Sequence, residues 1–215
     1  MATWYRDRND AGVALAKLLK NRMGPGTLLI CIPRGGAVIC SEISKEFGVG
    51  MDVITPRKIP APSNPELAIG AVVFDGTVWL DEKIVSELGV PDGYITDQVE
   101  KQKNESARRY SLFRRSAAEP NLVGKNVILV DDGIATGATV FAAVLWLQKK
   151  KPGTIIVSVP VSSRSAEQKL RELGVEVVCP EVADYMGAVG EFYENFDQVS
   201  DEEVIGLMDK YAKLN

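Results

Sequence analysis

The sequence contains no histidine among its 215 residues. This absence excludes Ser-His-Asp catalysis, Cys-His catalysis and every metal site that depends on imidazole ligands. Any reaction carried out by this chain must therefore use carboxylates, lysine, arginine, tyrosine, backbone amides or a bound metal ion.

Cysteine is also scarce, with only Cys31, Cys40 and Cys179 in the chain. They form no C-x-x-C pair, which argues against a metal site. Cys31 and Cys179 stand in apolar runs that are typical of strands. We interpret the cysteines as small buried hydrophobic residues in a reducing compartment.

Long apolar runs and an excess of basic charge are missing as well. No apolar run approaches the ~20 residues of a membrane span, and the first seven residues do not have the pattern of a signal peptide. The 25 Lys and Arg residues are outnumbered by 29 Asp and Glu residues, and the net charge of −4 does not favour nucleic-acid binding. We expect a cytoplasmic protein with neither membrane nor nucleic-acid partners.

The composition that remains is typical of a globular domain, with 46% hydrophobic and 25% charged residues. Short apolar runs alternate with helical patterns, which indicates an α/β fold with a mostly parallel twisted sheet and helices on both faces. The expected strands are residues 27–32, 51–55, 125–130, 154–161 and 175–179. The expected helices are residues 7–23, 37–47, 81–88, 91–115, 137–150, 163–173 and 201–213.

Two segments between these elements have patterns of their own. Asp75-Gly76 is typical of a hairpin turn, and it joins the apolar residues 68–74 and 77–80. We expect this hairpin to be an antiparallel addition to the sheet. Residues 59–66 carry three prolines and are expected to form a loop.

The character of the sequence changes after residue 180, where glycine and asparagine occur among aromatic residues. We predict a core of residues 1–180 and a small C-terminal hood, residues 181–215, that lies over one end of the sheet. The aromatic residues of the hood pack it together or contact a ligand.

Residues 127–139 carry the most informative pattern, Val-Ile-Leu-Val-Asp-Asp-Gly-Ile-Ala-Thr-Gly-Ala-Thr. The four apolar residues predict a buried strand, whose carboxyl end is where open α/β sheets bind ligands. Small residues follow and a helix begins, so free amides, threonine hydroxyls and the helix N-terminus can hold an anion. The predicted phosphate cradle consists of Gly133, Ile134, Ala135, Thr136, Gly137, Ala138 and Thr139.

Two acids, Asp131 and Asp132, stand beside this cradle and would repel a phosphate unless they serve another group. A ribose ring resolves the conflict, because its hydroxyls can donate to both carboxylates while its 5′-phosphate lies in the cradle. A divalent cation could share the same carboxylates. An Asp-capped helix after a buried strand is the simpler alternative. Neither the P-loop pattern nor a G-x-G-x-x-G after a strand is present.

A second glycine-rich turn, Arg34-Gly35-Gly36, follows the first expected strand. The arginine fork suits phosphate oxygens, and the two glycines allow the backbone to approach a diphosphate closely. Arg57 and Lys58 end the next strand and either face the same ligand or stay solvated. The arginines of the long charged helix are more consistent with a solvated or subunit-interface face than with catalysis: Arg108, Arg109, Arg114 and Arg115.

Residues 127–139 closely resemble the signature with which type I phosphoribosyltransferases bind 5-phosphoribosyl-1-pyrophosphate (PRPP). Residues 32–36 resemble the pyrophosphate loop of bacterial xanthine–guanine phosphoribosyltransferases. Nearly the whole chain is similar to predicted bacterial and archaeal phosphoribosyltransferases of unassigned acceptor. The residues that carry this similarity are Arg34-Gly35-Gly36, Arg57-Lys58-Ile59, Asn64-Pro65-Glu66-Leu67-Ala68-Ile69-Gly70 and Phe196-Asp197-Gln198-Val199.

The resemblance implies transfer of the 5-phosphoribosyl group from PRPP to an acceptor nitrogen, such as that of a nucleobase, with Mg²⁺ as cofactor. Asp131 and Asp132 would orient the ribose hydroxyls, offset positive charge on the sugar and share the metal ion. The pyrophosphate would be held by Arg34, Gly35, Gly36 and Lys58. An aromatic residue of the hood would stack on the acceptor, with Tyr185, Phe192 and Tyr193 as candidates in a cluster that also contains Phe196.

The resemblance further implies a homodimer and a cis peptide between Pro33 and Arg34. It also exposes a departure, because enzymes for 6-oxopurines have a proton-exchanging Asp where this chain has Ala135. A rival interpretation is a non-catalytic protein that senses PRPP or a nucleotide, since the same fold serves some regulators. Against it, both predicted anion loops look intact and no basic DNA-binding domain is present in the sequence.

Overall fold

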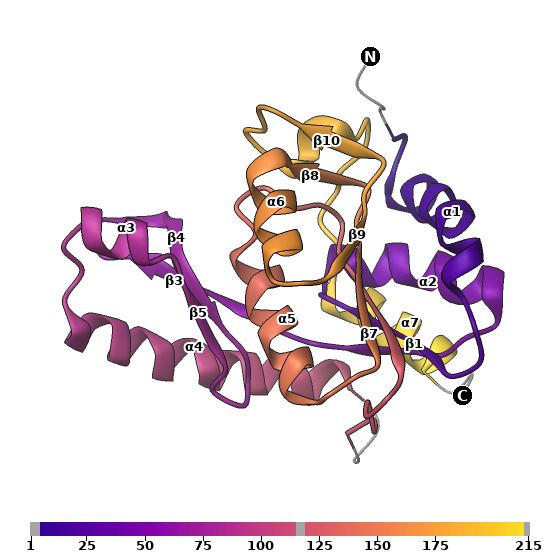
Figure 1. The fold of residues 1–215 in the computed structure, drawn as a ribbon, viewed down its shortest axis with the longest axis horizontal. Coiled ribbons are helices and arrows are strands. Elements are labelled where there is room, and N and C mark those ends of the chain that lie inside the picture. Colours follow the sequence, from indigo (N-terminus) through magenta and orange to yellow (C-terminus); the bar gives the residue numbers. More distant parts are fainter. Residues whose placement is uncertain (1–4, 115–118, 213–215) are drawn as a thin grey trace.

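The computed structural model describes residues 5–114 and 119–212 of the chain. Its centre is a parallel sheet of five strands in the order β2-β1-β6-β7-β9 (Figure 1). The strands are β1 Thr27–Cys31, β2 Met51–Val53, β6 Asn126–Val130, β7 Thr154–Ser158 and β9 Glu176–Val178. Strands β1 and β6 pair along their full lengths, so the loops that follow them leave the same edge of the sheet side by side.

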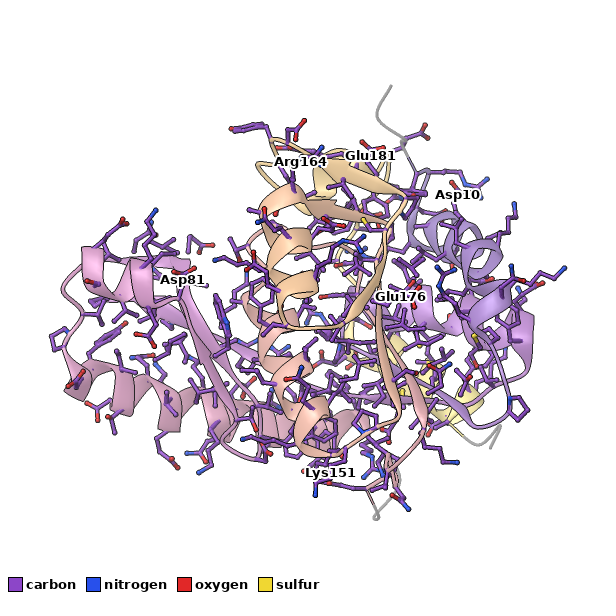
Figure 2. The ribbon with its side chains drawn as sticks, in the orientation of Figure 1. Asp10, Asp81, Lys151, Arg164, Glu176 and Glu181 are labelled. Carbon is purple, nitrogen blue, oxygen red and sulfur yellow. The ribbon has the colours of Figure 1, made fainter. Side chains whose placement is uncertain are left out.

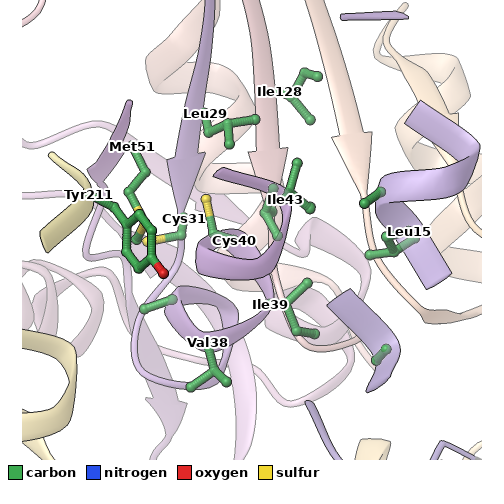
Figure 3. Packing of buried hydrophobic residues seen from close by; sticks show 14 of the residues in the cluster. Leu15, Leu29, Cys31, Val38, Ile39, Cys40, Ile43, Met51, Ile128 and Tyr211 are labelled. Atoms are coloured by element: carbon green, nitrogen blue, oxygen red, sulfur yellow. The ribbon is translucent and has the colours of Figure 1, made fainter. Parts of the chain in front are cut away.

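Helices cover both faces of this sheet, because successive side chains of a strand point to opposite sides. Leu29 of β1 joins a core with helices α1 (Arg8–Leu19), α2 (Gly35–Phe47) and α7 (Asp201–Tyr211), part of which Figure 3 shows. Its neighbour Leu28 joins the opposite core with α5 (Ala138–Lys149) and α6 (Arg164–Glu172). The predicted α/β architecture is therefore confirmed.

The cysteine prediction holds for two of the three residues. Cys31 and Cys40 are fully buried in the core beside α2 (Figure 3), whereas Cys179 is only partly buried. Within the described residues no three His, Cys, Asp or Glu side chains gather as a metal site. No helix in this part of the chain is long and apolar enough to cross a membrane.

Residues 57–113 form an arm that projects from the central sheet (Figure 1). Its strands, β3 (Arg57–Ala61), β4 (Asn64–Val72) and β5 (Val78–Leu80), make a separate antiparallel sheet. Helices α3 (Glu82–Glu87) and α4 (Asp92–Phe113) complete the arm around a small apolar core of its own. The Asp75-Gly76 turn between β4 and β5 is confirmed, although its strands do not extend the central sheet.

The arm corrects one prediction, since residues 59–66 form most of a hairpin and not a loop. Pro60 is accommodated because β3 is an edge strand whose pairing shifts register on both sides of this residue. Pro62 falls in the turn between β3 and β4, and Pro65 lies near the start of β4, outside the residues that pair with β5. Proline is excluded from the fully paired interior of a strand but not from turns, edges and strand starts, so the three prolines do not prevent a hairpin.

Asp81 joins the arm to the body of the molecule (Figure 2). Its carboxylate caps α3 by accepting from the Ile84 amide, and it also accepts from Lys169 of α6 at 3.0 Å. On the other side of the arm, Lys149 of α5 donates to the Thr77 hydroxyl at 2.8 Å. These contacts connect the arm to helices α5 and α6 of the body.

The hood divides into two parts. Its strand β10 (Glu181–Ala183) pairs with β8 (Val161–Ser163), and its short helix η2 (Val189–Phe192) is followed by a segment that pairs with the backbone of Tyr5. Helix α7 instead packs on α2. Strand β8 precedes residue 180 and β10 follows it, yet the two belong to one sheet. The division into a core of residues 1–180 and a hood of residues 181–215 therefore stays a prediction.

The remaining predicted elements are found, except that the expected strand 154–161 divides. Its first part forms β7, whereas Val161 begins β8, which pairs with β10 in a separate sheet. The first predicted helix continues after α1 as the 3-10 turn η1 (Lys20–Arg22). Residues 115 and 213, at the predicted ends of two helices, lie outside the described residues.

Candidate functional site

A cleft of about 660 Å³ opens at the carboxyl edge of the central sheet. Its walls are the loops after β1 and β6, the first residues of β3, and the hood around Val189 and Phe196. A hollow of similar size, about 680 Å³, lies at the opposite edge beside Arg22 and Glu176. The carboxyl edge is the one at which α/β sheets bind ligands, and it alone of the two contains the sequence motifs described above.

Asp131 and Asp132 follow β6 at the floor of the cleft. The Asp132 amide donates to the Asp131 carboxylate at 2.9 Å, which holds the two side chains next to each other. Removal from water raises the pKa of Asp131 well above its usual range, and the neighbouring Asp132 raises it further. Among the described residues Asp131 has no ion-pair partner, although Lys58 lowers its pKa from a distance.

Asp132 differs from Asp131 because it has a cationic partner, Arg8. The Arg8 Nε lies 2.9 Å from the Asp132 Oδ2, and both side chains are largely buried, with 11% and 18% exposed. Burial raises the pKa of the Asp132 carboxyl, and Arg8 opposes this effect. The sequence pattern gives no reason to distinguish the two acids, but in the structure they occupy different electrostatic environments.

Arg8 is the residue of this site that the sequence analysis missed. Besides Asp132, it donates to the backbone carbonyl of Asp197 at 2.8 Å, and its guanidinium carbon lies 3.8 Å from the centre of the Phe196 ring. No local pattern marks this arginine, since it stands in the first turn of α1 and meets partners more than 120 residues away. Only the fold brings it to the cleft.

The glycines of the Arg34-Gly35-Gly36 turn allow the loop after β1 to pack on the loop after β6. A Cβ on Gly35 would lie 1.8 Å from the Asp132 Oδ2, and a Cβ on Gly36 would lie 2.8 Å from the Val130 carbonyl oxygen. The packing of the two loops thus requires both glycines. This is a second reason for glycine here, besides the close approach to a diphosphate that the sequence indicates. The predicted cis peptide between Pro33 and Arg34 is confirmed.

The loop after β6 has the predicted form of an anion cradle, with one correction. The Ile134 amide donates to the Val161 carbonyl of β8 at 2.9 Å and is not available to a ligand. In the described part of the chain, the amides of residues 135–139 donate to no protein acceptor. Gly137 adopts a positive φ of 84° just before α5, so these amides and the helix N-terminus line one side of the cleft.

The opposite side of the cleft is cationic. Arg34 lines it, and its Nη1 lies 3.3 Å from the Asp201 carboxylate at the start of α7. Lys58 and Arg57 enter from β3. The Arg57 Nε is buried and has no hydrogen-bond partner in the described part of the chain.

The predicted aromatic candidates lie away from the cleft. Phe192 and Tyr193 are buried, and the Tyr193 hydroxyl donates to the backbone carbonyl of Asp132 at 2.7 Å. Tyr185 is 86% exposed and does not line the cleft either. The ring that does line it is Phe196, which packs against Tyr193 and Arg8.

A parallel sheet whose carboxyl edge carries an acid pair between two glycine-containing loops defines the type I phosphoribosyltransferase fold. The chain matches the family described as phosphoribosyl transferase domain over residues 10–197, and it belongs to this family.

Relatives agree with this assignment. The protein Rv0571c of Mycobacterium tuberculosis H37Rv, named as a phosphoribosyl transferase, is 36% identical over 96% of this chain and 46% of its own length. The chain thus spans about half of that relative. The crystal structure of TT1426 from Thermus thermophilus is 34% identical, with a TM-score of 0.80 over 98% of this chain and 100% of that one. A Neisseria gonorrhoeae protein crystallised with ppGpp shares the fold, at 18% identity and a TM-score of 0.52, over 97% of this chain and 96% of that one.

Proposed function

We propose that this chain transfers the 5-phosphoribosyl group from PRPP to an acceptor nitrogen and releases pyrophosphate. The observation that carries the proposal is that three kinds of group line one cleft. They are the cradle residues Ala135, Thr136, Gly137 and Thr139, the cations Arg34 and Lys58, and the acid pair. PRPP presents three matching groups, which are its 5′-phosphate, its pyrophosphate and its ribose hydroxyls.

Each residue then has a defined task. The cradle amides and the Thr139 hydroxyl hold the 5′-phosphate and so fix the ribose. Asp131 and Asp132 accept hydrogen bonds from the ribose hydroxyls and offset the positive charge that develops on the sugar. Arg34 and Lys58 bind the leaving pyrophosphate, whose negative charge increases as the bond to the ribose breaks.

The acid pair also fits a magnesium ion, because Mg²⁺ binds through one or two carboxylates and completes its shell with water and substrate phosphates. When bound, the ion would neutralise charge on the pyrophosphate. Asp131 is the better placed ligand, since Asp132 is already paired with the cation Arg8, whereas Asp131 has no ion-pair partner among the described residues. The protein's own contribution to this arrangement is to hold the two carboxylates next to each other.

Phe196 and Arg8 define the acceptor side of the proposed site. The Arg8 guanidinium lies against the Phe196 ring and also donates to Asp132. It therefore contacts both the ring and the acid that is proposed to bind the ribose. A flat heteroaromatic acceptor that stacks on Phe196 would therefore be aligned with the sugar. Arg8 acts here as a positioning residue, because it reaches the substrate through its two partners.

The decisive experiment measures pyrophosphate release from PRPP and Mg²⁺ with a panel of nucleobases and other amines. A signal that depends on one acceptor supports the proposal. PRPP binding in calorimetry without turnover on any acceptor would instead favour the non-catalytic sensor. Failure to bind PRPP at all would contradict both interpretations.

The purines hypoxanthine, guanine and xanthine are expected to be poor acceptors. Ala135 lines the cleft where a proton-exchanging group would be needed, and general acid–base help contributes about 10²–10⁴ in rate. The measurement is steady-state pyrophosphate release with each base at saturating PRPP. A kcat/KM above about 10⁴ M⁻¹s⁻¹, the lower end of the ordinary enzyme range, for any of the three would show that position 135 does not decide specificity.

Replacing Thr139 with Ala is expected to weaken PRPP binding by about 0.5–1.5 kcal/mol, the usual contribution of one hydrogen bond. The side chain stands at the start of α5 and lines the cleft. Calorimetric titration with PRPP provides the measurement. Thr139→Ser keeps the hydroxyl and should bind like the original chain, so an equal loss in both variants would point to packing in place of hydrogen bonding.

Replacing Arg8 with Met is expected to weaken PRPP binding about tenfold, which corresponds to about 1.4 kcal/mol. The change removes both hydrogen bonds of the guanidinium and leaves Asp132 without its orienting partner. Arg6→Met is the matched control, because the Arg6 side chain is 73% exposed and does not line the cleft. Unchanged affinity and unchanged KM for the acceptor in Arg8→Met would remove the positioning role.

A further inference from the structure

A further hollow, of about 540 Å³, lies on the arm beside the cleft. It runs along one face of α4 and is lined by Arg57, Lys101, Gln102, Asn104, Glu105 and Arg108. We call it the α4 groove. Arg57 lines both this groove and the cleft, so the two hollows meet at that side chain.

The lining of the α4 groove carries an excess of positive charge that the protein does not neutralise. Its only carboxylate, Glu105, already accepts from Arg108 at 2.7 Å and from Arg109 at 2.8 Å. These two hydrogen bonds lower the pKa of Glu105 to about 2. Among the described residues Arg57 and Lys101 have no ion-pair partner.

Arg57 is a charged residue of the groove with an unsatisfied donor. Its Nε is buried and has no hydrogen-bond partner within residues 5–114 and 119–212. Removal from water lowers the pKa of Arg57, and the neighbouring Arg109 lowers it further. A guanidinium in this position gains both a hydrogen bond and charge neutralisation from an anion, since charge-assisted bonds to phosphate are the strong ones.

We infer that the α4 groove binds the outer phosphates of a linear oligophosphate chain whose first two phosphates occupy the pyrophosphate side of the cleft. The inference rests on the proposed function for the location of those first two phosphates. Arg57 borders both hollows, so a chain that extends from the cleft past this side chain meets the further donors Lys101 and Arg108. Such a chain is either inorganic or part of a nucleoside polyphosphate.

The test compares the affinity of the full chain for inorganic pyrophosphate and inorganic triphosphate by calorimetry in the presence of Mg²⁺. We expect triphosphate to bind at least about tenfold more tightly than pyrophosphate. The double variant Lys101→Gln/Arg108→Gln should lose this preference, so that its triphosphate-to-pyrophosphate affinity ratio falls to about one. Arg109 remains in that variant to pair with Glu105.

The matched control is Lys45→Gln/Lys83→Gln, which removes the same charge from two exposed lysines outside the groove. Their side chains are 64% and 82% exposed. The control should keep the tenfold preference. Equal affinities for the two anions in the original chain, or a preference that survives Lys101→Gln/Arg108→Gln, would overturn the inference.

Two further measurements distinguish the source of the oligophosphate chain and test whether the groove is a subunit contact. A nucleoside 5′-triphosphate that also loses its affinity in the groove variant supports a nucleotide as the source of the chain, whereas a preference confined to inorganic triphosphate supports the free anion.

Sedimentation measures whether the variant changes oligomeric state. Such a change would make the groove a subunit contact and would overturn the inference. If pyrophosphate fails to bind while triphosphate binds through Lys101 and Arg108, the proposed function fails and the groove stands.

Discussion

Asp131→Asn and Asp132→Asn are both expected to reduce phosphoribosyl transfer at least about 100-fold, the usual effect of losing a group that stabilises developing charge. The two variants should nevertheless differ in stability. Asp131 is a desolvated carboxyl beside another acid with no ion-pair partner among the described residues, so neutralising it relieves repulsion. Asp132 is paired with Arg8, and neutralising it weakens a largely buried ion pair.

Thermal unfolding of the free protein measures this difference. We expect Asp131→Asn to raise the melting temperature and Asp132→Asn to lower it, each by at least about 2 °C, which about 1 kcal/mol produces in a chain of this size. The two changes are chemically identical and adjacent, so each serves as the control of the other. Shifts of the same sign, or full activity in the double variant, would contradict the assigned roles.

Replacing Gly35 with Ala is expected to reduce PRPP affinity by about two orders of magnitude or more, since a misplacement of about 1 Å in a site of this kind can cost about 10²-fold. The new Cβ would lie 1.8 Å from the Asp132 Oδ2 and 2.7 Å from the Arg8 Nε, so the acid and its partner must both move. Calorimetry with PRPP gives the affinity, and circular dichroism shows whether the fold survives.

Gly206→Ala is the matched control for this substitution. Gly206 lies inside α7, and a Cβ there would meet nothing within 4 Å. The change should stabilise the chain by about 0.5–1 kcal/mol, because alanine is the better helix former. Normal PRPP binding by Gly35→Ala would show that the close approach of the two loops is not needed for the proposed function.

The parts of the site that could be predicted are those encoded in short continuous segments. Residues 131–139 carry the acids, the small residues and the start of a helix in one stretch, so strand, loop and cradle follow from local rules. The same holds for Arg34-Gly35-Gly36. Even there, the sequence did not predict that the Ile134 amide donates to the Val161 carbonyl, because β8 comes from a distant segment.

The parts that could not be predicted depend on contacts between distant residues. Arg8 reaches Asp132 across 124 positions and Asp197 across 189. The positions of the hood aromatics could not be predicted for the same reason, since composition cannot tell that Tyr193 is buried on Asp132 while Phe196 lines the cleft. The loop expected at residues 59–66 was wrong because Pro60 lies in an edge strand and Pro65 near the start of β4, outside the residues that pair with β5. These positions are properties of topology and not of the local sequence.

The ion pair between Arg34 and Asp201 gives the proposed reaction an intramolecular competitor. A pyrophosphate that binds Arg34 must share it with, or take it from, a carboxylate 3.3 Å away. Because this carboxylate is tethered to the same protein, its effective concentration does not fall when product is dilute. In the proposed reaction, Asp201 would therefore lower the affinity for the leaving pyrophosphate and speed its departure, at the expense of tight product binding.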